Sequence, residues 1–217
     1  DNDIFNMITS VLWIAGITSA MNALDHMDGL AGGISFIACL AYLAVSMQAG
    51  TFFWGLLAVS LAGSILGFLC FNWHPAKIFM GDSGSFFLGF TLAAAGLMGG
   101  WSENPLKACI IPILILGLPI FDIAFVIVNR YIKGITTSIP EAIKYCGKDH
   151  IGHRMMNLGF SQKSSAKILC LFSAAIAISA ITIRNVSSFE AILLFIQVAA
   201  MYLILMFLMK NIELKIN

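Results

Sequence analysis

The sequence has few charged residues, and this scarcity excludes an ordinary soluble domain. Only 11% of its 217 residues are charged, whereas 59% are hydrophobic and the mean hydropathy is +0.93. About a quarter of the residues in a soluble domain are charged. The net charge of +1 also provides no basic field that would attract nucleic acid. We therefore expect an all-α integral membrane protein that has the lipid bilayer as a partner and binds no nucleic acid.

Metal-binding cysteine patterns and a recognisable start of a protein are also missing. The cysteines lack the spacing of metal ligands, and four of the five lie in or beside apolar runs, so we interpret them as small buried hydrophobes. The chain has neither an initial Met nor a signal peptide, and its first residues resemble an internal loop. We expect it to be the later part of a longer protein. The cysteines are Cys39, Cys70, Cys109, Cys146 and Cys170.

What the sequence does contain is a series of long apolar segments. A membrane helix requires about 20 mostly apolar residues, and seven segments approach this length, of which the fourth is short and rich in glycine. They predict one polytopic helical domain over residues 1–217, with an additional short helix near SIPEAIKYCG. The predicted spans are 4–21, 30–49, 52–71, 85–100, 108–128, 166–183 and 188–209.

Seven spans would place alternate connections on opposite sides of the membrane. Ten of the twelve Lys and Arg residues would then share one side, and only Lys107 and Arg184 would lie on the other. The positive-inside rule identifies the basic side as cytoplasmic, and the same side receives the polar motifs described next. The ten basic residues are Lys77, Arg130, Lys133, Lys144, Lys148, Arg154, Lys163, Lys167, Lys210 and Lys215.

The first motif is NALDHMDG, residues 22–29. Asp25 and Asp28 are three residues apart, so on a helical turn they would share one face, which Asn22 extends by another turn. One amide and two carboxylates supply hard oxygen donors at the membrane surface, where such groups are tolerated if they face a protein cavity. The alternative is a solvated helix terminus with ordinary interfacial charges.

The second motif, FNWHPAKIFMGDSGSFFLGF, covers residues 71–90. Its glycines allow a ligand to approach the backbone, the carboxylate of Asp82 could bind a metal, and N–H groups at the following helix start could bind phosphate. Alternatively, Asp82 or Ser83 caps that helix. Phe79 is an apolar residue in a polar connection, and it either packs in the membrane or stacks on a base.

The third motif is the basic stretch GKDHIGHRMMNLGFSQKSSAK, which begins at residue 147. His150, His153 and Arg154 lie close to Lys148 and Lys163, and such a cluster suits a diphosphate, which arginine can bind through two parallel hydrogen bonds. The alternative is a loop that is basic only because it is cytoplasmic. Zinc binding is disfavoured because no cysteine or further histidine at ligand spacing completes a site.

Together the three motifs offer carboxylates for a divalent cation and basic groups for phosphates. Mg²⁺ commonly binds one or two carboxylates together with substrate phosphate oxygens. Phosphoryl transfer requires mainly positioning and charge neutralisation from the protein. The sequence therefore predicts a phosphoryl-transfer site at the cytoplasmic membrane surface that uses one soluble phosphate substrate and one lipid phosphate.

The same motifs resemble those of the polyprenyl-phosphate N-acetylhexosamine-1-phosphate transferases. The family pattern N-x-x-D-G-x-D-G-L appears at residues 22–30, with His26 in place of the first glycine. The pattern F-N-x-x-P-A-K-x-F-M-G-D-x-G-S is unbroken at residues 71–85, and LPIFD at 118–122 is also similar. The pattern H-x-H-H-R appears at residues 150–154, with Gly152 in place of the middle histidine.

This resemblance implies a reaction and a location. UDP-HexNAc and polyprenyl (undecaprenyl) phosphate would give polyprenyl-diphospho-HexNAc and UMP, with Mg²⁺, or Mn²⁺ in its place, as cofactor. The resemblance favours the branch that uses UDP-GlcNAc, and the reaction would be the first step of lipid-linked cell-envelope polysaccharide synthesis. The protein would lie in the bacterial cytoplasmic membrane with its active site on the cytoplasmic face.

The resemblance also implies roles for individual residues. Asp28 and Asp82 would form the metal site, and they would be catalytic together with His150 and His153. The remaining assignments concern substrate binding. They place Asn22 and Asp25 in the nucleotide pocket, Phe79 and Gly81 beside the uracil, His150, His153 and Arg154 around the sugar diphosphate, and Asn72 among the substrate-binding residues.

One departure from the family pattern bears on whether this chain is active by itself. The family has about ten membrane helices and an adjacent Asp-Asp pair in its earlier part, and this chain has no such pair. We expect that the N-terminal helices are missing and that the chain alone is inactive; a non-catalytic relative is the alternative.

Three different functions compete with the proposed transfer. They are a lipid I-type phospho-MurNAc-pentapeptide transferase, a regulatory membrane subunit, and a transporter that uses the intramembrane carboxylate of Asp122. The sequence also leaves a homodimer open.

Overall fold

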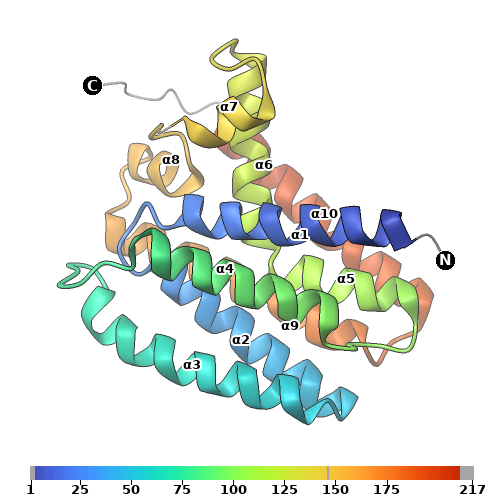
Figure 1. Cartoon of the computed structure of the whole chain (residues 1–217). Helices are drawn as coiled ribbons and strands as arrows, with labels where there is room; N and C mark the ends of the chain where they lie inside the picture. The colour runs from blue at the N-terminus through green and yellow to red at the C-terminus, as the bar shows by residue number, and fades with distance from the viewer. Residues whose placement is uncertain (1–2, 146, 211–217) are drawn as a thin grey trace.

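The computed structural model describes residues 3–145 and 147–210, and the part of the chain that it describes is helical without strands (Figure 1). The predictions made for Cys146, Lys215 and the Lys210 side chain lie outside the described residues. The helices are α1 (Asp3–Leu24), α2 (Leu30–Ala49), α3 (Phe52–Asn72), α4 (Gly81–Met98), α5 (Pro105–Ile115), α6 (Gly117–Ile132), α7 (Ile139–Lys144), α8 (Ile151–Asn157), α9 (Gln162–Ile183) and α10 (Ser188–Lys210).

The all-helical membrane fold is confirmed, but the predicted number of spans is not. Among the described residues, five helices are long and apolar enough to cross a membrane: α1, α2, α3, α9 and α10. A sixth span results if α5 and α6 are counted together. The fourth predicted span begins earlier than expected, because the polar residues 81–85 form the first turn of the 18-residue helix α4. This polar turn makes α4 less apolar than a typical membrane helix.

The predicted fifth span is broken rather than continuous. The axes of α5 and α6 differ by 72°, and the break follows from local chemistry. Pro119 has no N–H to donate to the carbonyl of Ile115, so the ladder of helical hydrogen bonds is interrupted there. Gly117 lies at the break, where an added Cβ would come within 2.6 Å of the Tyr202 hydroxyl on α10. A groove of about 470 Å³, lined by apolar residues of α5, α6 and α10, lies beside the bend.

Small residues allow the long helices to approach closely, as is common in membrane bundles. Helix α1 packs along α4, whereas α2 packs against α3 and α9 (Figure 1). At Gly89 of α4 an added Cβ would lie 2.7 Å from the Cα atom of Thr18 on α1. The indole N–H of Trp13 donates to the carbonyl oxygen of Ala93, 3.0 Å away. These contacts fix the register in which the polar ends of α1 and α4 meet.

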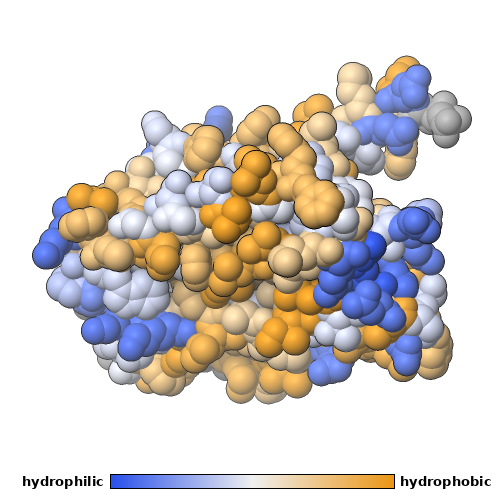
Figure 2. Space-filling view, turned by 90° about the horizontal axis from the view of Figure 1, so that it is seen from below, coloured by the Kyte–Doolittle hydropathy of each residue, from blue (hydrophilic) through white to orange (hydrophobic). Residues whose placement is uncertain are grey.

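The surface of the bundle is strongly apolar. Large hydrophobic side chains are exposed along α1, α3 and α10, and Phe52, Met47 and Leu171 are among the most exposed of them. Figure 2 shows a broad hydrophobic region across one face, with hydrophilic residues gathered toward its ends. In water such a surface would be unfavourable, so this pattern agrees with a protein whose helices are surrounded by lipid.

Candidate active site

The first two motifs meet where α1, α2, α3 and α4 come together at one end of the bundle. The side chain of Asn72, at the end of α3, is buried and bonds to two backbone segments. Its Oδ1 accepts from the N–H of Gly29 at 3.0 Å, and its Nδ2 donates to the carbonyl oxygen of Ile78 at 2.9 Å. Asn72 thus joins the loop after α1 to the loop before α4, while its predicted substrate contact stays a prediction.

Asp82 is held by α1 and does not cap its own helix through its side chain. Its Oδ1 accepts a hydrogen bond of 2.9 Å from Nδ2 of Asn22. The same amide also donates to the hydroxyl of Ser85 at 2.9 Å. Helix α4 begins after Met80 without a side-chain capping bond. The alternative of a capping role for Asp82 or Ser83 is therefore wrong for this structure, and Asn22 and Asp82 face each other as one unit.

Asp28 is held by the second motif rather than by a helical turn. Its Oδ2 accepts from Nδ1 of His74 at 2.8 Å and from the N–H of Ala76 at 3.1 Å. Helix α1 ends at Leu24, so residues 25–29 form a turn. The prediction that Asp25 and Asp28 share a helical face is therefore wrong. The spatial proximity of the two motifs, however, is present.

Asp25 experiences the charge of both other carboxylates. Burial, and then the negative charges of Asp82 and Asp28, raise the pKa of Asp25 to about 6. Three acidic groups that repel one another at a half-buried position are a local excess of negative charge. A hard divalent cation would relieve this repulsion, and carboxylate oxygens are its preferred ligands. The donor set around Asp25 therefore fits Mg²⁺ or Mn²⁺.

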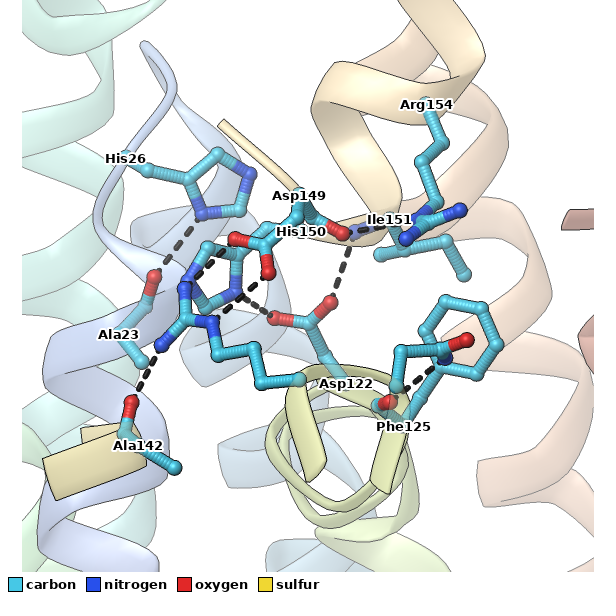
Figure 3. A network of polar contacts seen from close by, with 11 residues as sticks. Ala23, His26, Asp122, Phe125, Ala142, Asp149, His150, Ile151 and Arg154 are labelled. Atoms are coloured by element: carbon cyan, nitrogen blue, oxygen red, sulfur yellow. Dashed lines mark hydrogen bonds and ion pairs between the residues drawn. The ribbon is translucent and has the colours of Figure 1, made fainter. Parts of the chain in front are cut away.

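The third motif forms the other part of the site, around the buried carboxylate of Asp122 on α6 (Figure 3). Oδ2 of Asp122 accepts from Nδ1 of His150 at 2.7 Å, and Oδ1 accepts from the N–H of Ile151 at 2.8 Å. His150 precedes the first residue of α8, so this single carboxylate fixes both the ring and the helix start. The sequence predicts a loop for the third motif, but residues 151–157 are helical.

His26 reaches the third motif from the loop after α1. Its ring lies 4.9 Å from the ring of His150, nearly parallel at 26°, and 4.9 Å from the ring of His153, tilted at 36°. Burial, followed by the charge of His150 among smaller effects, lowers the pKa of His26 to about 4. Burial and the charges of His150 and Lys148 also lower the pKa of His153. His26 is therefore a neutral ring at physiological pH.

His26, Asp122 and His150 bring possible metal-ligand atoms within 4.8 Å of one another. Only two of the three side chains are hydrogen-bonded to each other. Asp122 and His150 are hydrogen-bonded to each other, and the two imidazoles stack face to face instead of converging on one point. The structure thus brings together three possible ligands that sequence spacing did not link. The hard-oxygen group around Asp25 nevertheless suits Mg²⁺ better.

Arg154 is 1% exposed and is bonded to the protein backbone. Its Nε donates to the carbonyl oxygen of Asp149 at 2.8 Å, and one Nη donates to that of Met209 on α10 at 2.9 Å. The guanidinium also lies over the ring of Phe125, 4.9 Å from its centroid. Arg154 thus joins α8 to α6 and α10 in this structure, and the diphosphate contact predicted for it stays a prediction.

A second arginine, which none of the three motifs includes, secures the segment before α8. Nε and Nη2 of Arg130 donate to the two carboxylate oxygens of Asp149 at 2.7 and 2.5 Å. Burial alone would raise the pKa of Asp149, but the hydrogen bonds and charge of Arg130 outweigh it and lower that pKa. The remaining Nη of Arg130 donates to the carbonyl of Ala142. No spacing rule links Arg130 to Asp149, so only the fold could reveal this pair.

The other predicted residues lie at the rim of the site. Phe79 is 77% exposed and shares a shallow apolar groove with residues of α3 and α4, so its ring is available for stacking. Gly81 begins α4 with a φ of +64°, which suits glycine. Lys148 and Lys163 are exposed. His74, which holds Asp28, is absent from the predicted set, although its place within the second motif was a usable signal.

Comparison with known proteins agrees with the family that the motifs predict. Residues 2–100 match the family described as Glycosyl transferase family 4. These residues include the first two motifs and therefore the three carboxylates of Asp25, Asp28 and Asp82, which form the carboxylate part of the site. Over these residues the chain is similar to this family.

Individual relatives extend the match beyond residue 100. The chain is 40% identical over 176 residues to the probable undecaprenyl-phosphate N-acetylglucosaminyl 1-phosphate transferase of Bacillus subtilis (strain 168). The aligned region covers 81% of this chain and 48% of that protein. It is 33% identical over 193 residues to the decaprenyl-phosphate N-acetylglucosaminephosphotransferase of Mycobacterium tuberculosis (strain ATCC 25618 / H37Rv), or 80% and 46% of the two chains.

A third relative matches a shorter region. The phospho-N-acetylmuramoyl-pentapeptide-transferase of Chlamydia muridarum (strain MoPn / Nigg) is 45% identical over 98 residues, which is 44% of this chain and 29% of that protein. The chain thus spans about half the length of the two relatives that it matches more extensively.

Proposed function

We propose that the complete protein transfers N-acetylglucosamine 1-phosphate from UDP-GlcNAc to a polyprenyl phosphate and releases UMP. The observation that carries this proposal is the hydrogen bond between Asn22 and Asp82, together with that between Asp28 and His74, because these contacts unite the first two motifs at one bundle end. The names of the Bacillus and Mycobacterium relatives describe the same transfer to undecaprenyl and decaprenyl phosphate.

Asp28 and Asp82 would hold Mg²⁺, with Asp25 beside them. The bound ion supplies neutralisation of the diphosphate charge and orients its oxygens. Asn22 keeps Asp82 directed into the site, and His74 does the same for Asp28. These residues bind and orient the nucleotide, and Phe79 offers its exposed ring to the uracil.

The transfer moves one phosphorus between two oxygens. An oxygen of the polyprenyl phosphate attacks the phosphorus that carries the sugar, and a new P–O bond forms. The bond from that phosphorus to the bridging oxygen breaks, and the bridging oxygen leaves with UMP. His150 and His153 would face the diphosphate as this charge shifts, and Asp122 holds His150 in place.

The lipid substrate needs an apolar surface next to this polar site. The groove beside the bend of α5 and α6 is lined by apolar residues such as Ile120, Phe121 and Leu203. One wall of this groove is α6, the helix that also contains Asp122. An apolar chain in this groove would reach the site from within the bilayer. This arrangement suits an active site at the cytoplasmic face of a bacterial cytoplasmic membrane.

The test uses the full-length protein in membrane vesicles with radiolabelled UDP-GlcNAc, undecaprenyl phosphate and Mg²⁺. We expect labelled lipid and an equal amount of UMP, both abolished by EDTA and restored by added Mg²⁺. Asp82→Asn should lack activity, whereas Glu103→Gln, an exposed carboxylate in the connection between α4 and α5, should retain it. Transport of UDP-GlcNAc without UMP release would contradict the proposal.

The sugar is the main alternative within the same chemistry. The Chlamydia muridarum relative acts on a muramoyl-pentapeptide according to its name, so UDP-MurNAc-pentapeptide is the competing donor. Parallel assays with both donors distinguish them, and we expect UMP release with UDP-GlcNAc. The transporter alternative loses its main argument, because both carboxylate oxygens of Asp122 are bonded to His150 and Ile151.

A further inference from the structure

Asp122, His150 and His153 form the histidine part of the site, at α6 and the start of α8. The loop after α1 adds the ring of His26 to this part. His26 stacks on His150 and is tilted against His153, with ring centroids 4.9 Å apart in both pairs. Stacked imidazoles restrict each other's rotation, because turning one ring would drive it into its neighbour. His26 therefore limits the orientations that the two other histidines can adopt.

The protonation of the His26 ring follows from its hydrogen bond. Nδ1 lies 2.9 Å from the carbonyl oxygen of Ala23, and since a carbonyl can only accept, Nδ1 carries the hydrogen. Nε2 then has a free lone pair. It is buried, and no described residue forms a hydrogen bond with it. Leaving such an atom unpaired is unfavourable, so something other than hydrogen bonding must favour this placement of the ring.

Gly152 explains how the ring fits. A Cβ atom added at Gly152 would lie 2.7 Å from Nε2 of His26 and 2.8 Å from Cε of Met27. Gly152 lies within α8, and glycine is less favourable than alanine inside a helix. The absence of a side chain at residue 152 leaves the space that the ring of His26 occupies. A side chain at residue 152 would therefore require the ring of His26 and the end of the Met27 side chain to shift.

We propose that His26 and Gly152 are a reciprocal pair, in which His26 supplies a third imidazole from the loop after α1 and thereby positions His150 and His153. His26 is a positioning residue, because it acts through the two rings that it contacts. This role rests on the proposed function, since His150 and His153 are assigned there to the sugar diphosphate. The pair also accounts jointly for the two departures from the family motifs, at residues 26 and 152.

The test is a cycle of three variants in the full-length protein: His26→Gly, Gly152→His, and both together. A displacement of reacting groups by about 1 Å can lower a rate roughly a hundredfold, so each single variant should lower kcat roughly tenfold to a hundredfold. The first creates space beside His150, and the second collides with His26. The double variant returns one histidine to the same space and should recover most of kcat.

Two matched variants separate positioning from general damage. His26→Gly combined with Asn157→His adds a histidine at an exposed site of α8 and should give no recovery. His26→Phe preserves a ring for stacking and should be more active than His26→Gly. A double variant no better than the product of the two single effects would overturn the proposal, as would full activity of His26→Gly.

A second measurement does not depend on the enzymatic assay. The ¹³C–¹H resonances of His150 and His153 in the detergent-solubilised protein should shift in His26→Gly and return toward their original positions in the double variant. If the wild-type protein released no UMP, the proposed function would fail while this ring packing could still be demonstrated. Unchanged His150 and His153 resonances in His26→Gly would exclude the positioning role itself.

Discussion

The carboxylate part and the histidine part of the site are built in opposite ways. Around Asp25 three acidic groups oppose one another, and burial together with the charges of Asp82 and Asp28 raises the pKa of Asp25 to about 6. Around Asp122 the polar groups are paired: the carboxylate accepts from His150 and from Ile151. One part has an excess of negative charge, whereas in the other part the carboxylate is paired with hydrogen-bond donors.

This difference indicates different tasks. An excess of negative charge is costly in the absence of a cation, so the carboxylate part is suited to binding an ion. A paired network holds its geometry without a ligand, so the histidine part provides a fixed frame. Changes in the first part should therefore affect activity more than stability, and changes in the second should affect both.

The largest effect is expected for Asp82→Asn or Asp28→Asn. Cation-mediated charge stabilisation in metal enzymes contributes several kcal/mol to catalysis, so UMP release should fall on the order of a thousandfold. Thermal unfolding in detergent should change little, because Asn at residue 82 can still accept from Asn22. The measurement is the initial rate across a Mg²⁺ titration. If Asp82→Asn had the wild-type rate at the Mg²⁺ concentration that the wild type requires, Asp82 would not be part of the metal site.

The next largest effect concerns the fixed frame. Asp122→Ala leaves the ring N–H of His150 and the backbone N–H of Ile151 without their acceptor, at about 1–3 kcal/mol for each buried group left unpaired. We expect a lower unfolding temperature as well as lost activity. Asp122→Asn retains one acceptor and should lose less stability. Equal unfolding temperatures for Asp122→Ala and the wild type would show that α8 is held by other contacts.

Arg154→Ala should have a smaller, mixed effect. Each hydrogen bond of its guanidinium to a backbone carbonyl is worth about 1.5–3 kcal/mol, and α8 should loosen when they are lost. We expect roughly a tenfold to hundredfold lower rate at limiting UDP-sugar and a lower unfolding temperature. Membrane insertion should persist, since nine of the ten cations predicted for the cytoplasmic side stay. If stability were unchanged while KM rose, Arg154 would contact the substrate directly.

The smallest effect is a pH dependence that arises from Asp25. Its pKa is raised from 3.8 to about 6 on folding, so between these values the folded state binds more protons than the unfolded state. Stability without a divalent cation should therefore fall as the pH rises from about 4 to 6. Solvent screening of this half-buried group keeps the change to about 1 kcal/mol or less.

Asp25→Asn should flatten this dependence, and saturating Mg²⁺ should do the same in the wild type. Unfolding temperatures between pH 4 and 7, with EDTA and with Mg²⁺, provide the measurement. Identical slopes for the wild type and Asp25→Asn would mean that Asp25 does not titrate in this range.

Much of this arrangement could be predicted from sequence, because hydropathy and motif residues are local signals. Helix α2 has the predicted bounds, 30–49, and the short helix near Pro140 is present as α7. The bend at Leu116 was missed because both of its halves are apolar, and hydropathy does not respond to the lost N–H of Pro119. Similarly, the helix start at Gly81 was missed because its first turn is polar.

Pairings between distant residues are a different kind of information. The motifs named Asp82, Asp28 and His150, but not what holds them. Asp82 is held by Asn22, 60 positions away in the sequence. Asp28 is held by His74, 46 positions away, and His150 by Asp122, 28 positions away. The role of His26 is the clearest case, since in sequence it is only a deviation from a pattern. Its neighbours are set by how the loop after α1 packs on α8.

Because of the bend between α5 and α6, α6 can be treated as a rigid rod that pivots about Leu116. Asp122 lies six residues beyond this pivot, about 9 Å along the helix axis at 1.5 Å per residue. A swing of about 10° would move its carboxylate by roughly 1.5 Å, more than a hydrogen bond can tolerate. His150 would have to follow or detach. Tyr202 packs against Gly117 at this pivot, so a contact between α6 and α10 is linked through α6 and Asp122 to the buried imidazole of His150.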